Sequence, residues 1–246
     1  LTGKTALVTG ANTGLGQAMA VALAHAGADI AAAGRSSAAE TGQLVEAAGR
    51  RFAEIRADLG DTSVAGGVVA DAVAALGGVD ILINNAGIIR RNDALDFTED
   101  DWDSVMNVNL KAAFFLSQAA ARHMVGAGRG GKIINIASML SFQGGIRVAS
   151  YTASKSGVAG LTKLLANEWA GKGINVNAIA PGYFATNNTE ALRADETRNS
   201  EILARIPAGR WGAPEALGGA AVFLSSSAAD YVHGTVLAVD GGWLAR

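Results

Sequence analysis

A phenol and an ammonium group four residues apart form the most reactive pairing in the sequence, in Tyr151-Thr-Ala-Ser-Lys155. On a helix such positions share one face, so we expect both side chains to point into one cleft. A tyrosine with its ordinary pKa of about 10 exchanges protons poorly at neutral pH, and a nearby lysine cation favours the phenolate. The pair therefore predicts proton exchange with an alcohol or carbonyl oxygen. Taken alone, the same spacing is more often surface decoration.

Two further polar residues strengthen this interpretation. Ser138 follows an apolar run of strand length and precedes Tyr151 by thirteen positions. Its hydroxyl is predicted to hydrogen-bond the substrate oxygen as charge develops there. Asn109, in Asn107-Val-Asn-Leu-Lys111, is predicted to position Lys155 through a water and to connect the proton path to solvent. The two residues turn an uninformative pair into a candidate reaction centre.

A glycine-rich turn near the N-terminus predicts a site for a diphosphate. Glycines permit a tight turn and let backbone N–H groups approach the anion, and the N-terminus of the helix that follows attracts it. The residues expected to contact a dinucleotide here are Gly10, Asn12, Thr13, Gly14, Leu15 and Gly16. Because the spacing differs from G-x-G-x-x-G, a glycine turn without a ligand remains the alternative.

The ends of the next three apolar runs extend this site. No carboxylate follows Ala31-Ala-Ala-Gly34, whereas Arg35 is suited to a ribose 2′-phosphate with a hydrogen bond from Ser36, which favours NADP(H). Asp58 is predicted to receive the adenine amino group and Leu59 to pack on its ring. The residues expected beside the cofactor after the third of these runs are Asn85, Ala86 and Gly87. A solvated arginine and ordinary turn residues are the alternatives.

Composition narrows the classes of function. The 246 residues are 50% hydrophobic, with 20 Lys+Arg against 22 Asp+Glu, so the chain can bury a core but offers no basic field for nucleic acid or anionic lipid. Cysteine is absent and His25, His123 and His233 lack metal-ligand spacing, so no metal site is expected. No apolar run is long enough to cross a membrane and no signal peptide opens the chain, so we expect a cytoplasmic protein.

Apolar runs of strand length alternate with longer, Ala-rich stretches of helical period. Seven strands are predicted, at 5–8, 29–33, 52–55, 81–84, 132–136, 174–179 and 235–239. Helices are predicted at about 14–26, 40–49, 61–76, 98–126 (as one helix or two), 151–171 and 214–225. This order predicts a single α/β domain of the Rossmann type, with a doubly wound, seven-stranded parallel sheet and helices on both faces. Right-handed crossovers bring the motifs to the carboxyl edge of such a sheet.

The order and spacing of these motifs resemble those of the short-chain dehydrogenases over essentially the whole chain. The residues that carry the resemblance are the turn from Thr9 to Gly16, Asn84-Asn-Ala-Gly87, Asn109, Ser138, Tyr151, Lys155 and Pro181-Gly-Tyr-Phe-Ala-Thr186. The resemblance implies a nicotinamide-dependent oxidoreductase whose catalytic residues are Asn109, Ser138, Tyr151 and Lys155. It also implies that Lys155 bonds the nicotinamide ribose, that Thr186 touches the carboxamide, and that Pro181, Gly182 and Phe184 contact the cofactor.

Within the family the chain is most similar to sugar-acid dehydrogenases, on segments such as 136–148 and 180–189. This resemblance implies hydride transfer at C5 of 2-dehydro-3-deoxy-D-gluconate, and it favours NAD(H), against the indication from Arg35. An acidic, polyhydroxylated substrate calls for an arginine fork and amide or hydroxyl partners. The predicted substrate residues are Ser138, Gln143, Arg147, Tyr183, Asn187 and Arg193, with a substrate-covering segment at about 183–212.

Alternatives remain at the level of substrate and of function. Gluconate, another sugar alcohol or a carrier-linked ketone are alternative substrates, and gluconate 5-dehydrogenase or another carbonyl reductase is the alternative enzyme. A non-catalytic dinucleotide-binding regulator is the alternative of another class, because fold does not fix function. The family's usual helix pairing implies a homotetramer, with the helices at about 109–126 and 151–171 packed against symmetry mates.

Overall fold

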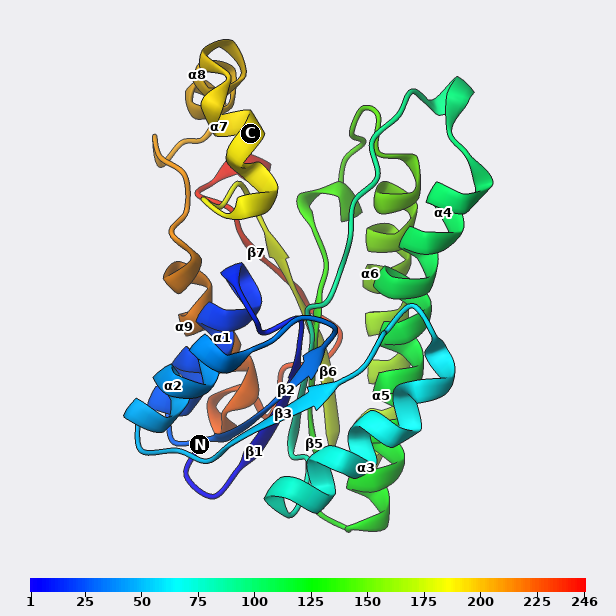
Figure 1. The fold of residues 1–246 in the computed structure, drawn as a ribbon, viewed down its shortest axis with the longest axis vertical. Helices are drawn as coiled ribbons and strands as arrows, with labels where there is room; N and C mark the ends of the chain where they lie inside the picture. The colour runs from blue at the N-terminus through cyan, green and yellow to red at the C-terminus, as the bar shows by residue number, and fades with distance from the viewer.

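A seven-stranded parallel sheet forms the centre of the molecule (Figure 1). The computed structural model describes the backbone of residues 1–246 and every side chain except that of Asn188. The strands are β1 (Thr5–Thr9), β2 (Asp29–Gly34), β3 (Phe52–Arg56), β4 (Ile81–Asn84), β5 (Gly131–Ile136), β6 (Ile174–Pro181) and β7 (Val236–Val239). All seven predicted strands are confirmed within two residues at each end. Their order in the sheet is β3-β2-β1-β4-β5-β6-β7.

Helices cover both faces of the sheet (Figure 1). They are α1 (Gly14–His25), α2 (Ala39–Ala47), α3 (Ala65–Leu76), α4 (Glu99–Met106), α5 (Ala112–Gly126), α6 (Ala149–Trp169), α7 (Glu190–Ala194), α8 (Glu196–Arg205) and α9 (Gly218–Ser225). Helices α1, α2 and α9 lie on one face, and α3, α4, α5 and α6 on the other. The predicted doubly wound α/β fold of a single domain is therefore confirmed.

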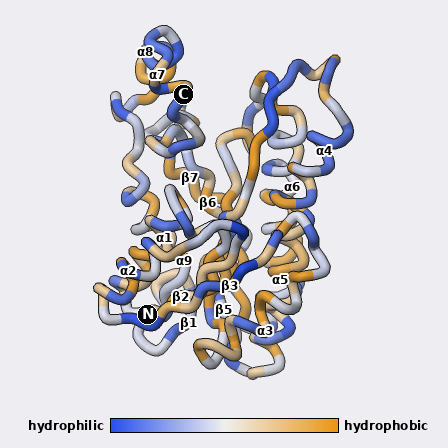
Figure 2. The backbone as a smooth tube through the Cα atoms, in the orientation of Figure 1, coloured by the Kyte–Doolittle hydropathy of each residue, from blue (hydrophilic) through white to orange (hydrophobic). Residues whose placement is uncertain are grey.

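Side chains that alternate along each strand contribute to two hydrophobic cores, one on each face of the sheet. On β1, Ala6 and Val8 face the core under α1, α2 and α9, whereas Leu7 faces the core under α3, α5 and α6. Successive side chains of a strand point to opposite faces, so a strand covered on both faces is apolar throughout. Figure 2 shows this hydrophobic character along the central strands. No helix of the described residues is long and apolar enough to cross a membrane.

The predicted helix at 98–126 is one continuous helical stretch with a change of winding inside it. The π-turn Asn107–Lys111 joins α4 to α5. Such turns insert one extra residue and occur often at functional sites. Sequence period alone did not predict it, because a π-turn keeps the chain helical and shifts only the face on which residues lie.

No helix was predicted from the sequence between residues 187 and 205. Helices α7 and α8 fill this segment, and Asp195 caps α8 by accepting a hydrogen bond from the Arg198 amide at 3.0 Å. The segment covers a small apolar cluster, separate from the two main cores, that includes Met139, Ile202 and Trp243. Two signals were available, the Asp-Glu pair that starts α8 and the separation of polar from apolar residues around the helix. Because α8 is mostly polar overall, neither signal led to a helix prediction.

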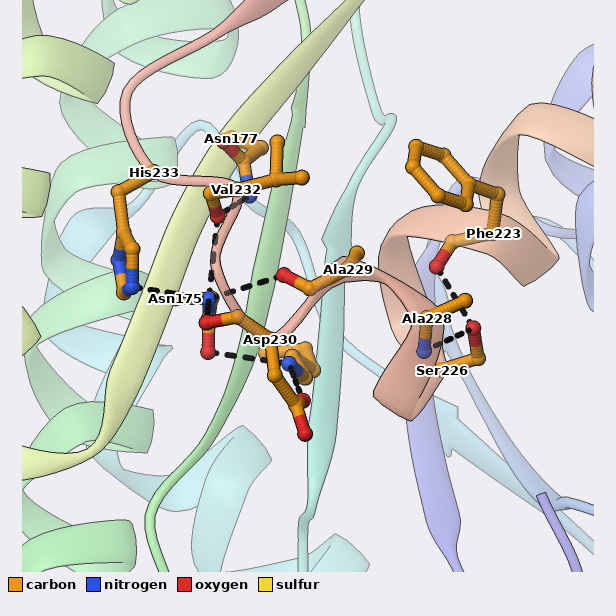
Figure 3. A network of polar contacts seen from close by, with 10 residues as sticks. Asn175, Asn177, Phe223, Ser226, Ala228, Ala229, Asp230, Val232 and His233 are labelled. Atoms are coloured by element: carbon orange, nitrogen blue, oxygen red, sulfur yellow. Dashed lines mark hydrogen bonds and ion pairs between the residues drawn. The ribbon is translucent and has the colours of Figure 1, made fainter.

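The edge strand β7 is held by amide side chains of β6 (Figure 3). Asn175 donates to the carbonyls of Asp230 and Val232 at 3.0 Å each, and Asn177 donates to Val232 at 2.8 Å. Lys132 bridges the Asn175 amide oxygen at 3.0 Å and the Asp230 carboxylate at 2.6 Å. These bonds satisfy the loop backbone before β7 and fix that strand against β6.

Candidate functional site

A cleft of about 580 Å³ opens at the carboxyl edge of the sheet. Strands β1 and β4 are neighbours there, and the chain leaves them toward opposite sides of the sheet. Such a switch point is where open α/β sheets bind ligands. The predicted residues that line the cleft are Gly10, Asn12, Thr13, Gly14, Leu15, Gly16, Arg35, Ser36, Asp58, Leu59, Asn85, Ala86, Gly87, Ser138, Gln143, Tyr151, Lys155, Pro181, Gly182, Tyr183, Phe184, Thr186 and Asn187.

The glycine turn is built so that backbone approaches backbone. Gly10 has a φ of 64°, and a Cβ at Gly16 would collide with the Gly10 carbonyl oxygen. The Asn85 amide donates to the carbonyls of Thr9 at 2.9 Å and Gly10 at 3.0 Å. Asn85 therefore fastens the end of β4 to the turn after β1.

The turn leaves donors for an anion. The side chain of Thr13, at the N-cap of α1, makes no capping hydrogen bond, and Gly14, Leu15 and Gly16 face the cleft. Unpaired N–H groups and the positive end of the helix dipole suit a diphosphate. The residues present thus fit the middle of a dinucleotide.

At the far end of the cleft, Arg35 and Asp58 lie side by side. The Arg35 guanidinium is 3.9 Å from the Asp58 carboxylate, and both side chains are more than half exposed. A pair so exposed and so long contributes little to stability. Asp58 also accepts a hydrogen bond from the Gly60 amide at 2.9 Å, so its carboxylate is oriented at the cleft edge while Arg35 stays available to a phosphate.

Tyr151 and Lys155 lie on the first two turns of α6 and line the cleft together. The Lys155 ammonium is 5.7 Å from the centre of the Tyr151 ring. It donates to the Ile136 carbonyl at 2.6 Å, and the lysine is almost completely buried. This hydrogen bond to the end of β5 therefore fixes the position of the ammonium group in the cleft.

Burial shifts the pKa values of Tyr151 and Lys155 away from their ordinary values. Burial raises the pKa of Tyr151, while the Ser138 hydroxyl and the charge of Arg91 act in the opposite direction. Burial also lowers the pKa of Lys155 to about 8. In this structure desolvation of the phenolate outweighs the opposing effects of Ser138 and Arg91 on the Tyr151 pKa. The predicted effect of the Lys155 cation on the phenolate stays a prediction.

Ser138 lies two residues after the end of β5 and caps the short helical turn Met139–Ser141. Its hydroxyl oxygen accepts from the Leu140 amide at 3.2 Å, which leaves the hydroxyl hydrogen free for the cleft. Ser141 donates to the Lys155 carbonyl at 2.6 Å and accepts from the Ser138 amide at 3.3 Å. Ser141 was not predicted, and it joins the strand-end serine to the helix residue that carries the ammonium.

Asn109 lies behind the cleft, on the π-turn. Its amide oxygen accepts from the Ile88 amide at 2.8 Å, and its amide nitrogen donates to Ser154 at 3.3 Å. Ser154 in turn donates to the Tyr151 carbonyl at 2.8 Å. Asn109 is thus connected to the tyrosine backbone through Ser154, and its predicted link to Lys155 through a water stays a prediction.

Two predicted substrate residues do not line the cleft. Arg147 has a left-handed φ of 63°, and its guanidinium lies 3.4 Å from the Asp93 carboxylate. Arg193 turns back along α7 and donates to the Thr186 carbonyl at 3.1 Å. Neither residue is among those that line the cleft, and their predicted contacts with the substrate stay predictions.

Two other arginines do line the cleft, Arg91 and Arg198. Arg91 lies near enough to Tyr151 to influence its pKa. Arg198, on α8, lies 3.0 Å from Glu201. Arg91 follows Arg90 in the sequence, and only the structure separates them, because Arg90 pairs with Asp101 at 3.2 Å.

Comparison with known proteins finds a matching family model and similar dehydrogenases. The family description "short chain dehydrogenase" matches residues 4–197. The 2-dehydro-3-deoxy-D-gluconate 5-dehydrogenase of Dickeya dadantii is 64% identical, over 100% of this chain and 97% of that protein.

Two solved structures superimpose closely on this chain. One is a candidate 2-deoxy-D-gluconate 3-dehydrogenase from Agrobacterium tumefaciens with bound NADP, at a TM-score of 0.96 and 64% identity, covering 100% of this chain and 98% of that one. The other is a gluconate 5-dehydrogenase from Burkholderia cenocepacia in complex with NADP and tartrate, at a TM-score of 0.95 and 41% identity, covering 100% and 97%.

Proposed function

The chain belongs to the short-chain dehydrogenase family and is an NAD(P)-dependent oxidoreductase acting on CH–OH groups, and we propose that its substrate is 2-dehydro-3-deoxy-D-gluconate, oxidised or formed at C5. The observation that carries this proposal is the 64% identity with the Dickeya enzyme over the whole chain. A cleft that contains Tyr151, Lys155 and Ser138 beside the glycine turn supports it.

In the proposed reaction, the Tyr151 hydroxyl gives its proton to the carbonyl oxygen during reduction and takes one from the alcohol during oxidation. A nicotinamide cofactor, when bound beside the glycine turn, would supply the hydride chemistry. The Ser138 hydroxyl donates its hydrogen to the same substrate oxygen, while its own oxygen accepts from the Leu140 amide. Lys155, tied to the Ile136 carbonyl, places its charge between the phenol and the ribose site.

For the cofactor, the proposal is NADP(H). Arg35 ends β2 in a position where a carboxylate would bond a free 2′-hydroxyl, and NADP is bound in the Agrobacterium and Burkholderia structures. Steady-state kcat/KM with NADP⁺ and NAD⁺, for wild type and Arg35→Ala, tests this. A preference for NAD⁺ that the substitution leaves unchanged would overturn the 2′-phosphate role.

For the substrate, the decisive experiment is a panel of keto and hydroxy sugar acids followed by absorbance of the reduced nicotinamide. The proposal expects the highest kcat/KM with 2-dehydro-3-deoxy-D-gluconate. A higher value with gluconate or 5-ketogluconate would favour the alternative of a gluconate 5-dehydrogenase, which the Burkholderia structure supports. No response from any sugar acid would return the substrate to the wider class of carbonyl reductions.

Tyr151→Phe separates an enzyme from a dinucleotide-binding regulator. It removes the transferred proton and leaves the glycine turn intact, so turnover should fall by at least about a thousandfold. Nicotinamide fluorescence on cofactor binding should be nearly unchanged. Retained turnover would contradict the proposed role of the phenol.

The proposal also includes the segment that covers the substrate, the assembly of the chain and the location of the enzyme. We assign α7, α8 and the rest of 183–212 to covering the substrate, because Tyr183, Asn187 and Arg198 from this segment line the cleft. Exposed Phe115 on α5 and Leu164 on α6 are consistent with a homotetramer packed through these helices. We propose a cytoplasmic location for the enzyme, in keeping with its cysteine-free sequence.

A further inference from the structure

The side chain of Gln143 is held from one side by two donors. Its amide oxygen accepts from the Trp243 indole nitrogen at 3.3 Å and from the Arg205 guanidinium at 3.4 Å. Arg205 lies 4.1 Å above the Trp243 ring, and Trp243 is buried in the apolar cluster under α8. The C-terminal turn and the end of α8 thus meet at one oxygen atom in the loop after β5.

The identity of these two neighbours fixes which way the amide faces. An indole and a guanidinium are donors only, so they tolerate the amide oxygen of Gln143 and would leave its nitrogen without an acceptor. A flip of the amide would set N–H groups against N–H groups. Since Gln143 also lines the cleft, its NH2 group is the part left to face the ligand.

We propose that Trp243 and Arg205 are positioning residues that hold the Gln143 amide with its NH2 group toward the cleft. This NH2 group donates a hydrogen bond to a carboxylate of the substrate, on the side of the cleft that α8 covers. The proposal rests on the proposed sugar-acid function and names the group that receives the acid. It does not use Arg147, which lies 3.4 Å from the Asp93 carboxylate and is not among the residues that line the cleft.

The charge distribution on this side agrees with an anionic ligand. Arg198 lines the same cleft, and the charges of Arg198 and Arg205 both oppose the burial that raises the pKa of Tyr183. Among the described side chains that line the cleft, Asp58 is the single carboxylate, and it lies beside Arg35 at the far end. An acceptor-only group is therefore favoured near Gln143, whereas a hydroxyl would gain no comparable attraction.

The test compares two probes of the same carbon skeleton. Tartrate carries two carboxylates, and threitol has hydroxymethyl groups in their place. Binding of each to the NADPH-saturated enzyme is measured by titration calorimetry for wild type, Gln143→Glu, Trp243→Phe and Trp211→Phe. Trp211 is the matched control, because its indole also donates one hydrogen bond, to Asn199 at 2.7 Å, and it belongs to the same apolar cluster without contacting Gln143.

We expect wild type to prefer tartrate over threitol by at least about tenfold, the effect of one or two charge-assisted hydrogen bonds. Gln143→Glu should abolish the preference. Trp243→Phe should reduce it about threefold, because one of two restraints on the amide is lost. Trp211→Phe, which keeps both hydrogen bonds to the Gln143 oxygen, should reduce it less. Thermal unfolding checks that both tryptophan variants lose similar stability.

The outcomes separate this proposal from the proposed function. Equal loss in the two tryptophan variants, or an unaltered preference in Gln143→Glu, overturns the donor role. A wild type without preference for tartrate does so as well. If the wild type turns over no sugar acid but keeps a tartrate preference that depends on Gln143 and Trp243, the substrate assignment falls and the carboxylate site stands.

Discussion

At the scale of single residues, the chemistry depends on how burial and charge set two pKa values in one cleft. Burial raises the pKa of Tyr151 and lowers that of Lys155 to about 8. The free side chains would stay protonated to near pH 10, so the fold brings the lysine closer to neutral pH and moves the tyrosine away from it. The positive charge of Arg91 opposes the rise of the Tyr151 pKa. Arg91 should therefore influence proton transfer by the tyrosine.

Removing that charge should move the pH profile. In Arg91→Gln the phenolate loses a favourable neighbour, so the Tyr151 pKa rises further and the midpoint of kcat against pH for alcohol oxidation shifts to higher pH. Arg90→Gln is the control, because Arg90 pairs with Asp101 and does not line the cleft. An identical midpoint in wild type and Arg91→Gln would show that the arginine does not act on the tyrosine.

Ser141 should matter for turnover although it has no place in the cleft. Ser141→Ala removes the bond to the Lys155 carbonyl and the acceptor for the Ser138 amide. We expect kcat to fall about tenfold through misplacement of these groups, with cofactor affinity nearly unchanged. Ser156→Ala breaks a second hydroxyl bridge between the same loop and helix, to Leu140 at 3.3 Å. A similar loss in both variants would point to general loosening of the loop instead.

At the scale of elements, the sequence predicted the framework well and the additions to it poorly. Strands such as β4 and β5 are rich in isoleucine and leucine and are bounded by glycine and polar residues, so their type and their ends could be predicted. The π-turn at Asn109 and the left-handed backbone at Arg147 were not predicted, because neither changes the local pattern of apolar and polar residues. Cofactor residues could be predicted because they follow strands, whereas substrate residues lie on loops whose direction no local pattern determines.

The glycine turn allows a sharp test at this scale. Gly16→Ala would place a methyl group against the Gly10 carbonyl, so the turn must open and the α1 amides must move. We expect cofactor affinity to fall by at least about tenfold, measured by nicotinamide fluorescence.

Gly67→Ala provides the control for this substitution. Gly67 lies inside α3 with open space where the methyl group would be. It should leave cofactor binding unchanged and raise the stability of the fold by about 0.5–1 kcal/mol, since alanine is the better helix former. Normal cofactor affinity in Gly16→Ala would mean that the turn is not packed as described.

At the scale of the whole molecule, the proposed tetramer would use for assembly the same helix that carries the catalytic pair. Helix α6 carries Tyr151 and Lys155 near its start and exposes Leu164, at 47%, further along. A leucine so exposed gains burial if α6 packs against another copy, whereas a charge there would have to be desolvated. Leu164→Glu should therefore lower the mass measured by light scattering below that of a tetramer. Turnover should fall as well, because α6 loses a support along its outer face.

Leu44→Glu separates this effect from a general cost of adding a charge. Leu44 is exposed to a similar extent, 42%, but lies on α2, on the opposite face of the sheet. The mass measured for wild type and its turnover should both be kept in that variant. If wild type is a monomer at assay concentration, or if both variants keep the full mass, the outer face of α6 is not an interface. Its exposed leucine would then reflect the ordinary apolar share of a protein surface.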